Sequence, residues 1–172
     1  QGASAQSEAR EEGSSARTIM SIRNLRVDMP GETVRNVSLD IREGEILGIG
    51  GLAGQGKLGI PNGVMGLYEA TGDVTILGKK LDLHKLGEAL RNDVAFVSED
   101  RRGVGLLLEE SIEQNIIFSA MQVKNKFLRT FGWIRLLDSA AAHAHAREMV
   151  QQLDIRCTGI SQPAGRLSGG NQ

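Results

Sequence analysis

Seven consecutive residues, rich in glycine and ending in lysine, could bind phosphate. Residues 51–57 read Gly-Leu-Ala-Gly-Gln-Gly-Lys, which fits the phosphate-loop pattern Gly-x-x-x-x-Gly-Lys. Glycines let backbone N–H groups converge on phosphate oxygens, and the lysine reaches the β- and γ-phosphates of a nucleotide. We therefore expect a nucleotide-phosphate site formed by Gly51, Gly54, Gln55, Gly56, Lys57 and Leu58.

The residue after the lysine departs from this pattern. It is Leu58, where a serine or threonine hydroxyl would coordinate Mg²⁺. Pro61 lacks the N–H that would bond to the Lys57 carbonyl, so we expect the following helix to be kinked or to start irregularly. The pattern predicts nucleotide binding but gives no support to metal-assisted hydrolysis at this loop.

A charged cluster follows an apolar segment in the middle of the chain. Residues 94–97 are apolar, and residues 98–102 read Ser-Glu-Asp-Arg-Arg. A buried strand with this ending would place its polar side chains at the carboxyl edge of a sheet, where α/β proteins bind ligands. Glu99 could then hold Mg²⁺ directly or through water, partly replacing what Leu58 cannot supply. The alternative is a solvated turn.

The last six residues form a third candidate site. Residues 167–172 read Leu-Ser-Gly-Gly-Asn-Gln. The Ser168 hydroxyl and the backbone N–H groups of Gly169 and Gly170 could bind a γ-phosphate, most readily at a helix N-terminus. The alternative is a flexible Ser-Gly-Gly tail.

The elements that would position these residues begin after a polar stretch. Residues 1–17 have no apolar periodicity and are expected to be a disordered linker. Residues 18–27 and 37–41 alternate as half-buried antiparallel strands joined by a turn at residues 29–31. A slip in the alternation predicts a bulge near residues 23–24.

Strands and helices then alternate, which predicts a parallel sheet core. Buried strands are expected at residues 45–49 and 94–97, with a further strand at residues 73–77. Helices are expected at residues 56–67 and 83–91.

The second half of the chain is expected to be mainly helical. Ser111 and Gln114 form a capping box for a helix to about Met121, and Asp138 can cap a helix to Leu153. The apolar residues between these helices are expected to form helical-subdomain core or, alternatively, a protein-docking surface; they are Met121, Phe127, Leu128, Phe131 and Trp133.

Composition and charge make several classes of protein less expected for this chain. The formal net charge is −1, without a basic stripe, so nucleic acid is not an expected partner. The one cysteine, Cys157, fits a reducing compartment. No apolar run approaches the ~20 residues that span a bilayer. His84, His143 and His145 have no metal-ligand spacing. We expect a soluble, cytoplasmic chain.

Together these motifs resemble the ATP-binding-cassette (ABC) ATPases, and more narrowly the second cassette of the two-cassette ATPases of simple-sugar importers. The resemblance covers residues 18–172; besides the phosphate loop it rests on residues 44–48, 98–102, 105–106 and 167–172. In the family the last segment is the signature motif, which caps the nucleotide held by a facing cassette. The resemblance implies an α/β fold: a partial P-loop ATPase core with an antiparallel β subdomain and an α-helical subdomain. The division is expected at residues 18–99 and 100–172.

The resemblance also implies partners and cofactors. ATP and Mg²⁺ would be the cofactors, with Glu99 as the metal-contacting residue. A second cassette, transmembrane permease subunits and, indirectly, a periplasmic or extracellular sugar-binding protein would be the partners. The protein would lie on the cytoplasmic face of the cell membrane and couple ATP binding and hydrolysis to transport of a simple sugar or related solute.

Three features depart from the family pattern. The family has an aromatic residue that stacks on adenine, and residues 28–32 contain none. The family also continues past the signature motif with a strand ending in Asp-Glu, which supplies the catalytic base, and then a switch histidine. None of these residues is in this chain, so we expect no catalytic residue here and low stability or association in isolation.

Two other functions remain open. Leu58 and the missing aromatic favour a regulatory nucleotide-binding half without turnover. Residues 48–53 also match the weak Gly-x-Gly-x-x-Ala dinucleotide fingerprint, with Glu69 about 20 residues on, as in a nicotinamide-dependent oxidoreductase.

Overall fold

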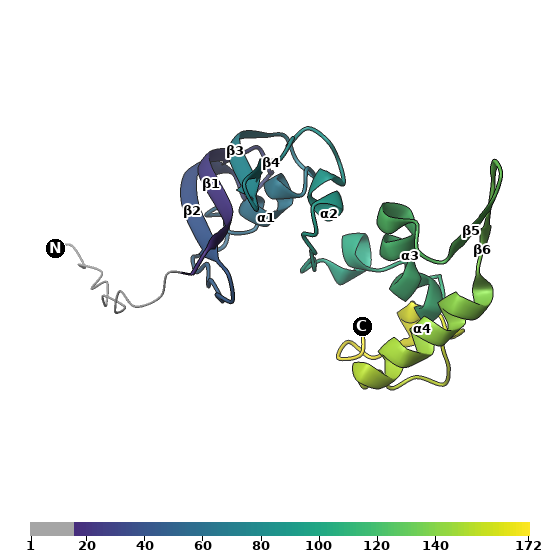
Figure 1. Ribbon diagram of the computed structural model, residues 1–172. Helices are drawn as coiled ribbons and strands as arrows, with labels where there is room; N and C mark the ends of the chain where they lie inside the picture. Colours follow the sequence, from purple (N-terminus) through teal and green to yellow (C-terminus); the bar gives the residue numbers. More distant parts are fainter. Residues whose placement is uncertain (1–15) are drawn as a thin grey trace. The chain divides into compact units, whose positions relative to one another are not determined.

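The computed structural model describes residues 16–172, which belong to two compact units (Figure 1). Unit 1 is described over residues 16–86, and unit 2 is Gly87–Gln172. The expected linker lies outside the described residues except for Ala16 and Arg17. Across residues 16–172 there is no helix with the length and apolar character needed to cross a membrane.

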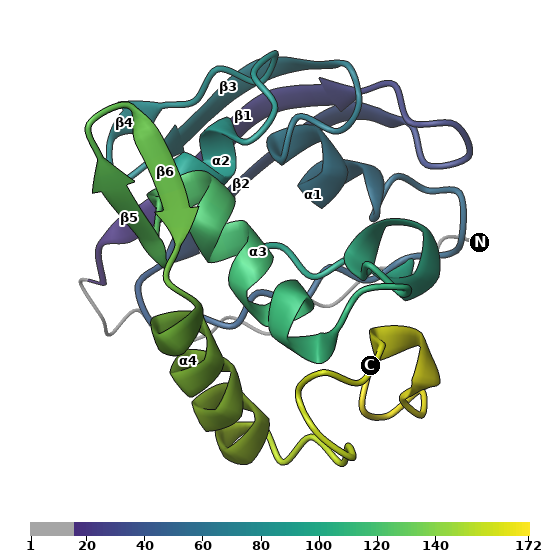
Figure 2. The same cartoon turned by 90° about the vertical axis from the view of Figure 1, so that its right-hand side faces the viewer.

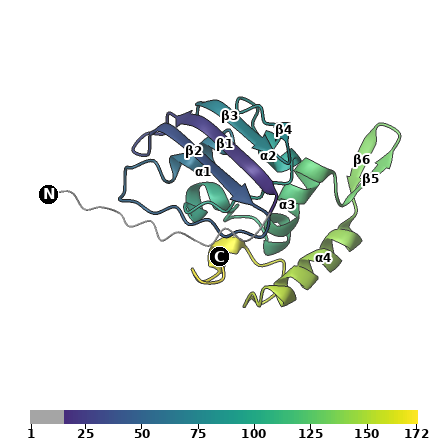
Figure 3. The ribbon, with the colours of Figure 1, turned by 60° about the vertical axis from the view of Figure 1, so that its left-hand side comes forward.

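Unit 1 is built on a four-stranded antiparallel sheet in the order β2-β1-β3-β4 (Figure 3). The strands are β1 (Thr18–Val27), β2 (Val34–Arg42), β3 (Ala70–Ile76) and β4 (Lys79–Lys80). The predicted antiparallel pair with a turn at residues 29–31 is confirmed as β1 and β2. Helix α1 (Gly59–Val64) lies against one face of this sheet (Figure 2).

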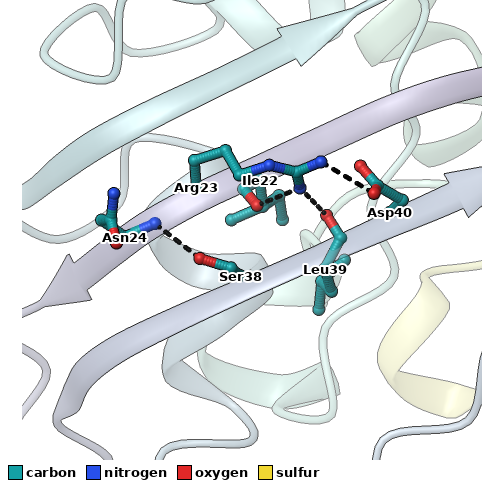
Figure 4. A network of polar contacts seen from close by, with 6 residues as sticks. All are labelled: Ile22, Arg23, Asn24, Ser38, Leu39 and Asp40. Atoms are coloured by element: carbon teal, nitrogen blue, oxygen red, sulfur yellow. Dashed lines mark hydrogen bonds and ion pairs between the residues drawn. The ribbon is translucent and has the colours of Figure 1, made fainter.

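The predicted bulge lies in β1, where the pairing with β2 shifts between Ile22 and Leu25 and Asn24 has φ 51°. Polar contacts hold the two strands together there (Figure 4). The Arg23 guanidinium donates to Asp40 at 2.8 Å, and the Asn24 N–H donates to Ser38 Oγ at 2.9 Å. The hydrogen bond from Arg23 also lowers the pKa of Asp40.

The core of unit 1 forms between the sheet and α1. Its most deeply buried large side chains come from the central strand and its neighbour, β3; they are Ile22, Leu25, Val27 and Val74. Helix α1 is shorter than the predicted helix at residues 56–67. Pro61 stands in its first turn, where N–H groups have no partner within the helix, so the proline is accommodated there.

Two predicted strands are absent from the described chain. Residues 45–49 and 94–97 make no strand pairing, and Ile46 and Val97 are 95% and 93% exposed. An apolar segment becomes a strand only when a neighbour completes its hydrogen-bond ladder, and no described segment pairs with either. The expectation of a parallel core is therefore wrong for residues 16–172, whose strand pairs are antiparallel.

Unit 2 contains α2 (Glu88–Arg91), α3 (Ile112–Lys124) and α4 (Ser139–Gln152). A π-helical turn at Arg101–Gly105 and a 3₁₀ turn at Ala164–Arg166 complete its helical structure. The predicted capping box of Ser111 and Gln114 is present, and Asp138 caps α4 by accepting from the Ala141 N–H. Helices α3 and α4 contact each other, and bury Ile112, Ile117, Ala142 and Ala146.

A β-hairpin that was not predicted from the sequence joins α3 to α4. Strands β5 (Leu128–Phe131) and β6 (Ile134–Leu137) are linked by Gly132 and Trp133 (Figures 1 and 3). The expectation of a core here is wrong for Phe131 and Trp133, which are 60% and 94% exposed. The other three residues of that apolar group, Met121, Phe127 and Leu128, are half-buried.

Two leucines of unit 1 allow a matched test of this core. Leu25 is fully buried and Leu52 is 74% exposed. We expect Leu25→Ala to lower the free energy of unfolding by about 2–5 kcal/mol, because it leaves a cavity in the core. Leu52→Ala should change it by less than about 0.5 kcal/mol. Urea unfolding followed by circular dichroism measures both, and equal effects would contradict the placement of Leu25.

Candidate phosphate-binding site

The phosphate loop, residues 51–58, directly precedes α1, and three of its backbone N–H groups bind one carboxylate. Gly54 N donates to Glu32 Oε1 at 2.7 Å. Gly56 N and Leu58 N donate to Glu32 Oε2 at 2.8 Å and 3.4 Å. Glu32 comes from the turn between β1 and β2, 22 residues before Gly54 in the chain. The loop therefore converges on anionic oxygen, as the sequence predicts, and the anion is a side chain of the same unit.

Glycines allow this turn and the loop to approach so closely. A Cβ at Gly56 would lie 2.8 Å from the Thr33 carbonyl oxygen, and one at Gly59 would lie 2.2 Å from the Glu32 carbonyl oxygen. Gly56 also has φ +85°, a backbone conformation that favours glycine. Gly56, which belongs to the phosphate-loop pattern, thus also allows close contact between the loop and the β1–β2 turn.

Glu32 is 7% exposed and is held as a carboxylate by its surroundings. The hydrogen bond from Gly54 is the largest cause that lowers its pKa; the bonds from Leu58 and Gly56 and the charge of Lys57 act in the same direction. Burial acts in the opposite direction because it disfavours the charged form. The net shift is downward, which fits an anion-binding loop.

Lys57 and Leu58 end the loop, where the phosphate-loop pattern has a lysine and then a metal-binding hydroxyl. The Lys57 Nζ donates to the Gly51 carbonyl at 2.9 Å. Leu58 contributes its backbone N–H to Glu32, and its aliphatic side chain has no atom that could ligate a metal. The loop can thus supply donors to an anion, but no metal ligand at that position.

A cavity of about 670 Å³ adjoins the loop. Gly54, Gln55 and Gly56 line one part of it, and Thr33 and Arg35 line another. Its volume lies within the range of small-ligand sites. A ligand in this cavity would lie beside the amides that bind Glu32.

The other predicted site residues belong to unit 2. Glu99 is exposed, and the described residues contain no group of three or more His, Cys, Asp or Glu side chains suited to a metal ion. Asp100 caps the π-helical turn by accepting from the Gly103 N–H at 2.8 Å. The charged cluster at residues 98–102 therefore has a local structural role through Asp100.

The segment at residues 167–172 is linked to that cluster. The Arg101 guanidinium donates to the Gly169 carbonyl oxygen. Within the segment, Asn171 Nδ2 donates to Ser168 Oγ at 2.9 Å, and the Asn171 N–H donates to the Ser168 carbonyl at 2.9 Å. Two segments 68 residues apart in the chain thus meet in unit 2.

Neither the Glu32 carboxylate nor the contact of Arg101 with Gly169 was predicted from the sequence. Glu32 stands in the Met-Pro-Gly-Glu turn after β1, within residues 28–32, where the family resemblance implied an aromatic residue and gave no role to a carboxylate. The other sequence signal was its turn position next to a strand that precedes the glycine-rich loop. That signal is too general to identify a binding partner.

The loop amides converge on an anion ahead of α1, and residues 167–172 form an ordered segment in unit 2. The family model described as "ABC transporter" matches residues 34–172. The chain belongs to the ABC transporter family. In the described chain residues 48–53 are followed by α1 but not directly preceded by a strand, so the dinucleotide fingerprint and the phosphate-loop pattern both lack their strand.

The chain is similar to ATP-binding proteins of bacterial sugar importers. It is 39% identical over 155 residues to "Ribose import ATP-binding protein RbsA 2" of Rhizobium meliloti, covering 90% of this chain and 28% of the relative. It is 32% identical over 148 residues to "Xylose import ATP-binding protein XylG" of Thermoanaerobacter pseudethanolicus, covering 84% and 28%. The chain thus spans less than a third of the length of these curated relatives.

The lowered pKa of Glu32 predicts a pH dependence of stability. A carboxyl whose pKa is lower in the folded state stabilises the fold above its unfolded pKa, about 4.3 for glutamate, and loses that effect as the pH falls toward the folded value. Glu32→Gln should therefore lose stability at pH 7 and differ less from the natural protein at pH 3.5. Urea unfolding at both pH values measures this difference.

Glu32→Gln must be compared with the natural protein because other carboxyls with lowered pKa values make stability depend on pH in both proteins. These are Asp40, Asp82, Asp93 and Asp138. A stability difference that stays constant from pH 7 to pH 3.5 would show that the Glu32 charge is not bound by the loop.

Proposed function

We propose that this chain is part of the ATP-binding subunit of a sugar importer, in which ATP binding and hydrolysis drive transport of a simple sugar or related solute. The observation that carries the proposal is the convergence of the Gly54, Gly56 and Leu58 amides on anionic oxygens. The matched relatives, whose names refer to ribose and xylose import, support the transport class.

The phosphates of ATP fit this loop. Glu32 shows that its amides can bind two oxygens of one anion, and phosphate oxygens would accept the same hydrogen bonds. Lys57 would add a positive charge at the β- and γ-phosphates. We further propose that Ser168, Gly169 and Gly170 contact a nucleotide held by a second cassette, with Gly51 and Gln55 completing the phosphate loop of this one.

The residues fit Mg²⁺ less well. Leu58 offers no ligand, and the loop contributes no other metal-binding side chain. Glu99 remains the candidate contact, directly or through water. The remaining ligands of the ion would be phosphate oxygens and water, as is common for Mg²⁺ bound with nucleotides.

The proposed class of protein, a sugar-importer ATP-binding subunit, also implies its partners. We propose that the protein pairs with a second cassette and contacts transmembrane permease subunits at the cytoplasmic face of the membrane, with a sugar-binding protein acting on the other side. In this arrangement the β-sheet part of the chain holds nucleotide and the helical part carries the signature segment. Closure of two such cassettes on ATP would shift the permease between its conformations.

A second candidate function is a regulatory nucleotide-binding half without turnover. Leu58 favours it, because the position offers no hydroxyl for the metal. ATPase assays on the longer protein that contains this chain distinguish the two functions. Unchanged turnover in Lys57→Ala favours the regulatory half, and lost turnover favours a hydrolytic one.

ATP binding is tested most directly at Lys57. We expect Lys57→Ala to weaken ATP binding by about tenfold or more, because it removes a charge-assisted contact to phosphate. Isothermal titration calorimetry of the chain measures the affinity. Lys126→Ala is the matched control, since it removes the same charge from an exposed position in unit 2. Equal ATP affinity in both variants would refute the assigned role of Lys57.

The metal contact is tested at Glu99. We expect Glu99→Gln to reduce the gain in ATP affinity on adding Mg²⁺ roughly tenfold, equivalent to about 1.4 kcal/mol, because an amide is a weaker ligand than a carboxylate. ATP titrations with and without Mg²⁺ measure it, with the exposed Glu109→Gln as control. An unchanged metal dependence would remove Glu99 from the site.

A further inference from the structure

Glu32 binds the same backbone groups that a nucleotide phosphate would need. Both of its carboxylate oxygens accept from the loop, at 2.7 Å from Gly54 N and at 2.8 Å from Gly56 N. An N–H group directed at one oxygen cannot form an equally good hydrogen bond with a second anion beside it. Two anions would also repel each other at this distance. Carboxylate and phosphate therefore exclude each other at these amides.

The turn that carries Glu32 is itself ordered. The Glu32 N–H donates to the Met29 carbonyl at 3.0 Å, and Thr33 Oγ1 donates to the same carbonyl at 3.3 Å. The turn lies between β1 and β2, and its backbone packs against Gly56 and Gly59. The ordered turn between β1 and β2 thus positions the Glu32 carboxylate at the loop.

The protein also has space beside the loop. The cavity of about 670 Å³ reaches Gly54, Gln55 and Gly56, and Arg35 contributes to its lining. A polyphosphate bound in this cavity would therefore lie next to the loop backbone. What it must displace is the Glu32 carboxylate.

We propose that Glu32 is an internal competitor for the phosphate loop, and that nucleotide phosphate binds when this carboxylate leaves the Gly54 and Gly56 amides. The proposal rests on the proposed function, because it assigns those amides to phosphate. Exchange of one anion for another would couple nucleotide binding to movement of the β1–β2 turn. Nucleotide affinity would then depend on how firmly that turn holds its carboxylate.

The experiment compares tripolyphosphate binding to the natural chain, Glu32→Gln and Glu32→Ala by isothermal titration calorimetry. A competitor that occupies the amides nine-tenths of the time weakens apparent affinity about tenfold. We expect Glu32→Ala to bind about tenfold more tightly than the natural chain. Glu32→Gln should lie between them, since its amide retains one acceptor oxygen. Glu43→Gln, which alters an exposed glutamate of unit 1, should bind like the natural chain.

Nuclear magnetic resonance of the natural chain gives a second readout that needs no variant. Saturation with tripolyphosphate should shift the Glu32 carboxyl carbon resonance as the carboxylate loses its amide donors, and should leave that of Glu43 in place. This readout applies even if the Glu32 variants fail to fold. Unchanged Glu32 and shifted Gly54 and Gly56 amide resonances at saturation would overturn the competition.

The outcomes separate the two proposals. Equal or weaker binding by a folded Glu32→Ala, with clear binding by the natural chain, overturns the competition and leaves the phosphate site intact. No binding by the natural chain or by folded Glu32→Ala overturns the phosphate site itself, and the competition with it.

Discussion

Unit 1 depends on the pairing of β1 along both of its edges. This strand lies between β2 and β3 and supplies most of the deeply buried side chains of the sheet. The bulge at residues 23–24 interrupts its ladders, and a side-chain bridge from Arg23 to Asp40 lies beside the bulge. The turn that follows β1 then brings Glu32 to the phosphate loop. The geometry of the candidate site is therefore a consequence of sheet pairing as much as of the loop sequence.

The features that the sequence predicted well are those encoded by neighbouring residues. Alternation of Val37, Leu39 and Ile41 identified β2, and a change of phase located the bulge in β1. Ser111 and Asp138 marked the starts of α3 and α4, because a cap acts within one helical turn. The loop glycines likewise predicted converging amides, which is a local property of the backbone.

The features that the sequence did not predict depend on partners distant in the chain, except for the local β5–β6 hairpin. Residues 45–49 and 94–97 have the apolar character of buried strands, but no described segment supplies their hydrogen bonds. The β5–β6 hairpin depends on a two-residue connection, where Gly132 at φ +61° permits the reversal. Glu32 was missed for a similar reason: the groups that bind it lie more than 20 residues away. The amides could be anticipated from the sequence, but not the anion that they hold.

The position of Trp133 determines what the intrinsic fluorescence of the protein reports. It is the only tryptophan of the chain, it stands in the β5–β6 connection, and it is 94% exposed. Its indole is already in water in the folded protein, so its emission maximum will move little when the chain unfolds. The single tyrosine, Tyr68, belongs to unit 1. Intrinsic fluorescence excited at the indole band is therefore a reporter of the hairpin, insensitive to loss of the β1–β3 sheet and its bound Glu32.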